Sequence, residues 1–493
     1  MKLKIFFISA FIVLMSFVFV ACFNVNDTGT PDRNDGGEQQ AVPEFGFGLS
    51  EDGEYAVLTT VYANGAKEIT VPSEYQGLPV KEIGYHAFGT CVAVVSVTLP
   101  EGTVGIGDYS FSGCMSLQQI VLPDSLETIG SNAFFNCSAL EKIELPQSLT
   151  SLGKEAFSEC VLLESVDLPE GLESVGEYAF SYCKALEKAE ISSTVKEIGK
   201  EAFIGCESLL EINVDKNNFF YKSVDGNLYD KEGKILYKYA EGKTAKEFSV
   251  PEGTEEIVSR ALYGSKFESV VVPDSVNKIG KEAFRDCNSL KSITLPFVGE
   301  QRDAETNTAF HYIFGIDGSY NTYVPESLTD VVITGGKSVA ARAFQFCDGI
   351  KRVTLADSIT SIGDYAFTDG ILEYIDMGNG VTSIGYGAFH SCENLENIVL
   401  SAKLLAIGDR VFYDCTSLTE LTIPASVITI GRDNVLGCDA LESVYFENVN
   451  GWRICLVNTF MSQVKSVSAA TLSDPQSAMN FWKENTAMYW KRY

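Results

Sequence analysis

The fold is decided by a 23-residue unit that reads PDSLETIGSNAFFNCSALEKIEL from Pro123 to Leu145. Its cysteine recurs at the same 23-residue step, and its Ile-Gly and Ala-Phe pairs keep the same phase. The cysteines in step are Cys91, Cys114, Cys137, Cys160, Cys183 and Cys206, and later Cys392, Cys415 and Cys438. A fixed period of about 20–50 residues indicates an array of stacked units that share one core.

The pattern inside one unit predicts its local structure. Ile143-Glu144-Leu145 alternates between apolar and polar side chains, which predicts a short strand. Ile129-Gly130 predicts a bend, where the missing Cβ of glycine helps. Ala133, Phe134 and Cys137 fall on one face of a predicted helical turn. We therefore expect a parallel strand on one face of each unit and a helical turn on the other.

Counting the Ala-Phe pair or its substitutes gives 13 units. They are centred on Phe88, Phe111, Phe134, Phe157, Phe180, Phe203, Leu262, Phe284, Phe344, Phe367, Phe389, Phe412 and Val435. The pattern I-G-x-x-A-F-x-x-C-x-x-L-x-x-I-x-L-P resembles the BspA-like class of the leucine-rich-repeat family over about residues 44–450. The resemblance implies an α/β solenoid: a right-handed coil of about 13 units of 22–23 residues, with a parallel concave β-sheet and β-hairpin insertions.

The N-terminus looks like an export signal. Lys2 and Lys4 precede an uncharged apolar run from Ile5 to Ala21, which is too short for an ordinary membrane span. The run ends in Phe19-Val20-Ala21-Cys22, which resembles the lipobox of bacterial lipoproteins. We therefore expect residues 1–22 to be a lipoprotein signal peptide with a lipidated Cys22, the alternative being ordinary signal cleavage. A polar segment, 23–43, reads as a flexible tether.

We place the boundaries of the remaining segments where the 23-residue repeat begins, where it is interrupted and where it ends. Strand-like residues before the first unit predict an N-terminal cap, and Asp225-Gly226 between alternating aromatic residues predicts a hairpin. The predicted segments are a β cap at 44–80, repeats at 81–214, a β-hairpin insertion at 215–248, repeats at 249–296, an insertion at 297–337, repeats at 338–450 and a C-terminal cap at 451–493. The C-terminal segment also carries aromatic and basic residues, so contact with a membrane surface or cell wall is an alternative role for it.

Composition and motifs exclude several functions. The chain has 66 acidic and 37 basic residues and a net charge of −29, which argues against nucleic-acid binding. With three histidines and no G-x-S-x-G, P-loop or H-E-x-x-H motif, we predict no enzyme, no cofactor and no metal site. The repeated cysteines occupy equivalent places in successive units, so we expect a column of buried thiols rather than disulfides.

The strand register predicts which side chains reach solvent on the concave face. Glu144, Asp167 and Glu190 are 23 residues apart and should form a column of carboxylates, with Lys142 and Lys188 beside it. The candidate partner-binding residues are Lys142, Glu144, Asp167, Lys188, Glu190, Tyr374, Asp376 and Tyr445.

An export signal, a long array and no catalytic motif together favour a binding protein. The family resemblance implies a lipid-anchored adhesin on a bacterial cell surface that holds a protein or glycan, for which host extracellular matrix and mucin are the candidates. It would contact the membrane only through its N-terminal lipid. Two alternatives are a passive structural envelope protein and a glycan-active enzyme. The enzyme would use Glu144, Asp167 and Glu190, because adjacent carboxylates about 5 Å apart match a retaining glycosidase in spacing.

Overall fold

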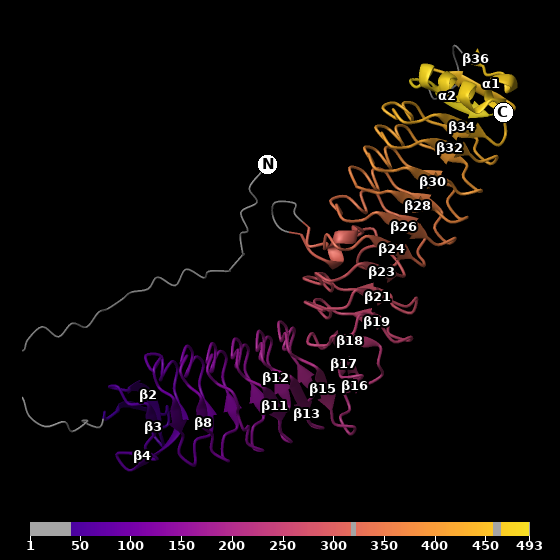
Figure 1. The fold of residues 1–493 in the computed structure, drawn as a ribbon. Helices are drawn as coiled ribbons and strands as arrows, with labels where there is room; N and C mark the ends of the chain where they lie inside the picture. Colours follow the sequence, from indigo (N-terminus) through magenta and orange to yellow (C-terminus); the bar gives the residue numbers. More distant parts are fainter. Residues whose placement is uncertain (1–40, 317–321, 457–464, 493) are drawn as a thin grey trace, which may run out of the picture. The chain divides into compact units, whose positions relative to one another are not determined.

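The structure, a computed structural model, describes residues 41–316, 322–456 and 465–492. The predicted signal peptide with Cys22, and the tether up to residue 40, lie outside the described residues. Residues Ala41–Tyr493 form one compact unit, a parallel β-solenoid (Figure 1). It has about 17 turns rather than the predicted 13. The difference arises because the ends and insertions also coil without an Ala-Phe pair: β2 (Ala56–Tyr62) pairs in parallel with β5 (Leu78–Ile83).

The strands predicted from the Leu-x-x-Ile-x-Leu segments form one side of the solenoid. We call them the leucine strands, and their solvent-exposed side the leucine-strand face. In chain order they form four parallel sheets: β3 (Glu68–Thr70), β6 (Ser96–Thr98) and β8 (Gln119–Val121); β11 (Ser165–Leu168), β13 (Lys188–Ile191) and β15 (Glu211–Val214); β19 (Glu247–Ser249), β21 (Ser269–Val271), β23 (Ser292–Leu295), β24 (Asp330–Ile333), β26 (Arg352–Leu355), β28 (Tyr374–Asp376) and β30 (Asn397–Val399); and β32 (Glu420–Ile423) with β34 (Ser443–Phe446).

One leucine strand is missing. Residues 141–146 form no strand, and the sheets that end at β8 and begin at β11 are separated there. The strand predicted for Ile143–Leu145 is therefore wrong. Ile143 and Leu145 are half-buried, whereas the equivalent Val166 and Leu168 of the next turn are buried.

The predicted bend at Ile129-Gly130 is instead part of a second parallel sheet, the glycine-side sheet. Its strands are two residues long, such as β9 (Thr128–Ile129), which pairs with β7 (Gly105–Ile106) and β10 (Ser151–Leu152). Ile129 points into the core, and the amide of Gly130 donates to the carbonyl of Ile106 (2.7 Å). Two residues are too few to show alternation in the sequence, so this sheet gave no strand signal.

Along the chain the glycine-side sheet is divided into three separately hydrogen-bonded sheets. The first holds β1 (Glu44–Leu49), β2, β4 (Glu74–Tyr75), β5, β7, β9, β10, β12 (Ser174–Val175) and β14 (Glu197–Ile198). The second holds β16 (Tyr221–Val224), β17 (Asn227–Asp230), β18 (Ile235–Lys238), β20 (Glu256–Ile257) and β22 (Lys278–Ile279). The third holds β25 (Ser338–Val339), β27 (Ser361–Ile362), β29 (Ser383–Ile384), β31 (Ala406–Ile407), β33 (Thr429–Ile430), β37 (Tyr489–Arg492), β35 (Trp452–Cys455) and β36 (Lys465–Ser466).

The predicted helical turn around the Ala-Phe pair is a series of tight turns instead. Asn132 has a φ of 54°, which an α-helix does not accept, and the equivalent Glu155 has the same value. The amide of Phe134 donates across to Ala156 in the next turn (2.8 Å) rather than along a helix. Helix is confined to the short η1 (Phe310–Ile313) and to α1 (Ala469–Ser473) and α2 (Pro475–Glu484) within the described residues.

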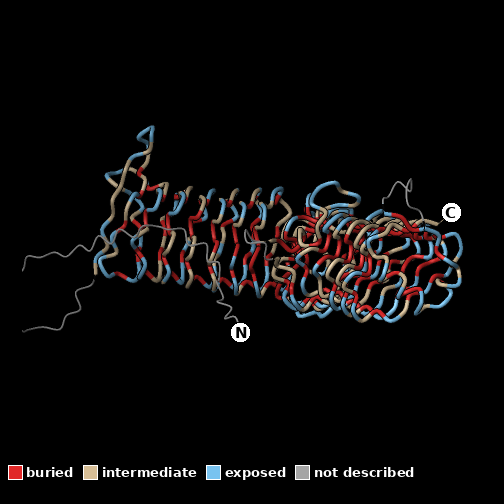
Figure 2. Tube along the Cα trace, turned by 90° about the horizontal axis from the view of Figure 1, so that it is seen from above, coloured by how far each residue is buried: buried red, intermediate tan, exposed pale blue. Residues whose placement is uncertain are grey.

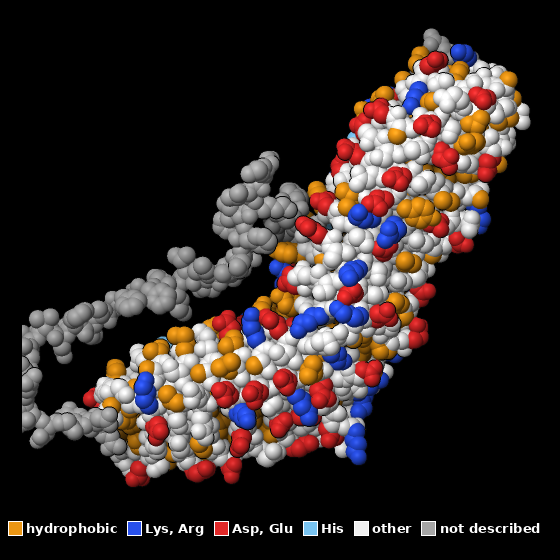
Figure 3. Space-filling view, in the orientation of Figure 1, with side chains coloured by type: hydrophobic (Ala, Val, Ile, Leu, Met, Phe, Trp, Pro, Cys, Tyr) orange, Lys and Arg blue, Asp and Glu red, His pale blue; other side chains and the backbone are white. Residues whose placement is uncertain are grey.

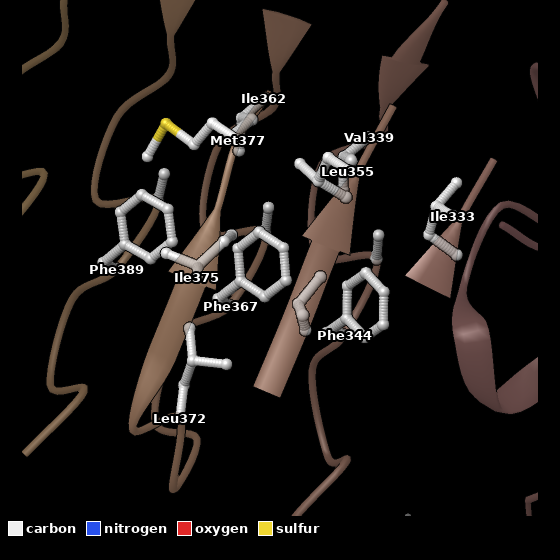
Figure 4. Close-up of a cluster of buried hydrophobic side chains, with 14 of the residues drawn as sticks. Ile333, Val339, Phe344, Leu355, Ile362, Phe367, Leu372, Ile375, Met377 and Phe389 are labelled. Carbon is white, nitrogen blue, oxygen red and sulfur yellow. The ribbon is translucent and has the colours of Figure 1, made fainter. Parts of the chain in front are cut away.

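The core consists of columns of identical side chains, one from each turn. The rings of Phe111, Phe134 and Phe157 lie parallel with centroids 5.0 Å apart, and Figure 4 shows the same arrangement for Phe344, Phe367 and Phe389. Figure 2 shows buried and exposed positions alternating along each turn.

The predicted column of thiols is also present. Cys160 is buried and unbridged, its Sγ donates to the carbonyl of Phe134 (3.2 Å), and burial raises its pKa to about 12. Cys137 and Cys183 occupy the same place in the turns on either side and are also buried and unbridged. Stacking therefore gives each thiol a backbone carbonyl as its partner instead of a second sulfur.

Both ends of the core are covered. At the N-terminal end β1 pairs antiparallel with β2. At the C-terminal end β37 pairs antiparallel with β33, and α2 packs against β34. Trp482 and Trp490, one from α2 and one from β37, are fully buried over the last turn. The unit Ala41–Tyr493 thus has its own core and closed ends.

Candidate functional site

The structure brings Glu144, Asp167 and Glu190 together in one groove of about 510 Å³ on the leucine-strand face. Asp167 of β11 lies directly opposite Glu190 of β13 in the parallel register. Glu170 and Asp215 also line this groove. We call it the acidic groove. Figure 3 shows acidic side chains, with basic ones among them, on the face of the molecule that it displays.

The carboxylates of the acidic groove differ in their partners. Glu190 is compensated, because Lys188 Nζ lies 2.5 Å from its Oε1 and Asn213 Nδ2 donates to the same oxygen (3.1 Å). The hydrogen bond to Glu190 raises the pKa of Lys188. Glu144 and Asp167 are exposed, and neither forms an ion pair with any of the described residues. Glu170 and Asp215 are likewise exposed without an ion pair among the described residues, so the groove presents an excess of negative charge to solvent.

The other predicted site residues lie elsewhere. Tyr374 and Asp376 belong to β28, in the seven-stranded sheet, and Asp376 Oδ1 accepts the amide of Gly378 (2.9 Å). Tyr445 belongs to β34, in a two-stranded sheet beside α2. Because these strands belong to different sheets from the acidic groove, the eight predicted residues do not form one site. Lys142 is exposed in the segment that lacks a strand.

Sequence reasoning missed Glu170 and Asp215, which follow the ends of β11 and β15 rather than lying in the strands. Their position in the sequence could have identified them. Each follows a predicted strand closely, and residues at that place also lie next to their equivalents in adjacent turns. A list restricted to the strand residues could not include them.

The chemistry open to the acidic groove is recognition of positive charge. Within the described residues, no group of three or more His, Cys, Asp or Glu side chains is placed to hold a metal ion. Carboxylates at equivalent positions of adjacent turns lie one strand spacing apart, about 4.8 Å, wherever they occur in such a fold. That spacing alone does not define a catalytic pair. None of the helices described is both long and apolar enough to cross a bilayer.

The stacked turns, the leucine strands and the buried Phe and Cys columns define a leucine-rich-repeat protein. The chain matches the family model for the BspA type leucine rich repeat region, in six copies over residues 81–210, 235–311 and 319–453, and it belongs to this family. This agrees with the resemblance inferred from the repeat pattern.

One solved structure shows the same fold, and two others show weaker similarity. A leucine-rich repeat protein from Bacteroides ovatus is 24% identical with a TM-score of 0.58, covering 82% of this chain and 98% of its own. A leucine rich cell surface protein from Faecalibacterium prausnitzii is 23% identical with a TM-score of 0.43, covering 86% and 96%. The pneumococcal vaccine antigen PcpA is 22% identical with a TM-score of 0.49, covering 83% and 93%. No curated protein matches the chain.

Proposed function

We propose that this protein is a non-enzymatic adhesin of a bacterial cell surface, which holds a protein or glycan partner on its leucine-strand face and insertions. The observation that carries the proposal is the acidic groove, where Glu144 and Asp167 are exposed and form no ion pair with the described residues. Stacked like charges repel each other, and a bound basic surface would relieve that repulsion.

The form of the molecule supports this role. A repeat array presents a broad surface rather than a deep pocket, which suits macromolecular partners. A basic segment of an extracellular-matrix protein is the kind of partner that the carboxylates complement. A net charge of −29 disfavours nucleic acid. Export and a lipid on Cys22 would place the array outside the cell, attached to the membrane only through that lipid.

Binding of the unit Ala41–Tyr493 to immobilised matrix proteins and mucin tests the proposal. The informative variant combines Glu144→Gln, Asp167→Asn and Glu190→Gln, which removes three charges from the groove. The matched control combines Glu51→Gln, Glu54→Gln and Glu101→Gln, three exposed residues away from the groove. We expect the three substitutions in the groove to weaken binding by about tenfold or more. Added salt should weaken binding of the unaltered protein, because it screens the charges.

Two outcomes would contradict the proposal. Equal binding by the groove variant and the control variant would show that the acidic groove is not the contact. Absence of binding to every matrix protein and mucin would favour a passive structural role instead.

A further inference from the structure

A second groove system lies on the other side of the solenoid, over the glycine-side sheet. One groove of about 740 Å³ runs along β5, β7, β9 and β10, and a second of about 500 Å³ continues it along β10, β12 and β14. The two share Leu152 as a lining residue. Together they cover six consecutive strands of one sheet, which we call the glycine-side groove.

The rim of this groove carries exposed aromatic rings. Tyr85 is 71% exposed and lines the groove, and Tyr109 of the next turn, 37% exposed, does not line it but follows the lining residue Asp108 in the chain. Their ring centroids are 5.7 Å apart in an edge-to-face arrangement, and the ring of His86 lies 6.1 Å from that of Tyr85. Exposed tyrosines that cover no core offer a flat apolar face and a hydroxyl to a ligand.

The rim also carries hydrogen-bond acceptors with spare capacity. Glu82 Oε1 accepts the hydroxyl of Tyr55 (2.6 Å), and Asp108 Oδ1 accepts the amide of Ser131 (2.7 Å). The second oxygen of each carboxylate has no hydrogen-bond partner in the described part of the chain. These two bonds hold the carboxylates in place while leaving one oxygen of each for a ligand.

Apolar and polar groups both line the floor of the groove, Ile106 and Ile129 among the apolar ones and Thr128 and Ser151 among the polar ones. Thr128, Ser151 and Ser174 lie opposite one another in adjacent strands, and their outward hydroxyls have no hydrogen bond to any described residue. Glu82 and Glu197 stand at the two ends of the same row. The groove therefore offers free hydroxyls on three consecutive turns, while Gly105 holds the same place one turn earlier.

The spacing between successive turns indicates which kind of extended chain could fit the groove. Adjacent strands are about 4.8 Å apart, which is close to the length of one pyranose unit in an extended chain. A peptide strand rises about 3.4 Å per residue and would drift out of step with the turns that form the floor. Four carboxylates and one cation line the groove, namely Glu82, Asp108, Glu177, Glu197 and Lys200, and this excess of negative charge would disfavour a uronic or sialic acid.

We propose that the glycine-side groove binds an extended, neutral polysaccharide chain, with about one sugar residue on each turn. Tyr85 and Tyr109 would stack against the apolar faces of the sugar rings, and the hydroxyls of the floor would bind those of the sugar. This deepens the proposed function, since it presupposes a binding protein, but it assigns a separate face and names the class of ligand.

Calorimetric titration of the unit Ala41–Tyr493 with oligosaccharides of two to eight units tests this assignment. The neutral probes are cello-, chito- and malto-oligosaccharides, and the charged probe is oligogalacturonate. We expect at least one neutral series to bind, with affinity that rises with length and levels off near six units, because six strands line the groove. Oligogalacturonate should bind more weakly.

Two floor variants and one rim variant locate the site. Thr128→Trp and Ser174→Trp fill the floor from outward positions without entering the core, and each should weaken binding by about tenfold or more. Tyr85→Ala should weaken it by about fivefold through loss of one stacking contact. Gln119→Trp, at an exposed position on the leucine-strand face, is the matched control and should leave the affinity for the oligosaccharide unchanged. Circular dichroism checks that each variant is folded.

The assignment is overturned if no neutral series binds, if oligogalacturonate binds best, if affinity does not depend on length, or if both folded floor variants bind like the control. Binding of peptides but not of oligosaccharides would overturn it equally. Each of these results leaves matrix-protein binding through the acidic groove to be judged by its own variants, so the two proposals can fail separately.

Discussion

Replacing Phe157 by leucine should reveal how much the ring column contributes to stability. Phe157 is fully buried, and its ring stacks on Phe134 at 5.0 Å and on Phe180 at 5.5 Å, each with an interplanar angle of 2°. A stacked aromatic pair contributes about 0.5–1.5 kcal/mol beyond the area that it buries. Losing two pairs while keeping an apolar side chain should therefore cost about 1–3 kcal/mol.

The column supplies its own control. Phe88 is equally buried but has one stacked neighbour in the column, Phe111 at 4.4 Å, so Phe88→Leu should cost about half as much. Leu262 occupies the same position in another turn, fully buried, which shows that the fold accepts leucine there.

Hydrogen exchange followed by mass spectrometry is the suitable assay, because long repeat arrays need not unfold in one step. We expect Phe157→Leu to raise the exchange rate of its own turn and of the two adjacent turns, and to leave the C-terminal turns unchanged. The reasoning is refuted if Phe157→Leu costs no more free energy than Phe88→Leu, or if the destabilisation spreads evenly along the array.

Three further predictions concern other positions. Gly153→Ala should destabilise the protein by more than about 1 kcal/mol in thermal unfolding, because its Cβ would lie 2.4 Å from a backbone carbon of the preceding turn. Cys160 should resist iodoacetamide at pH 8 until the protein is denatured, because burial raises its pKa to about 12 and the reagent needs the thiolate. Hydrogen bonds from Lys246 and Lys291 lower the pKa of Glu268 to about 2, so its stabilising effect is complete above about pH 4.3 and is lost as the pH falls toward 2. The difference in melting temperature between the unaltered protein and Glu268→Gln should accordingly disappear near pH 2.

The repeat period alone was enough to predict the solenoid, the leucine strands and the buried columns. Phe134 and Cys137 recur in phase because each must fill the same place in the next turn, and a physical requirement repeated so often leaves a strong pattern. The same register placed Glu144, Asp167 and Glu190 beside one another, as the acidic groove has them.

Other features left little trace in the sequence. The glycine-side sheet escaped prediction because its strands have two residues, and the turns at Asn132 and Glu155 escaped it because many residue types occupy that left-handed position. The missing strand at Ile143–Leu145 keeps a strand-like pattern, so only the three-dimensional pairing reveals it.

The pairing between turns has a consequence for how such a gene can change. Ser165 pairs with Lys188, and Lys188 with Glu211, so each contact joins residues one full unit apart. Duplication of a whole unit within the gene would lengthen the protein by about 4.8 Å and create no new kind of contact. Loss or gain of a single codon inside a strand would turn its buried side chains outward. Natural variants of this protein should therefore differ in length by whole units.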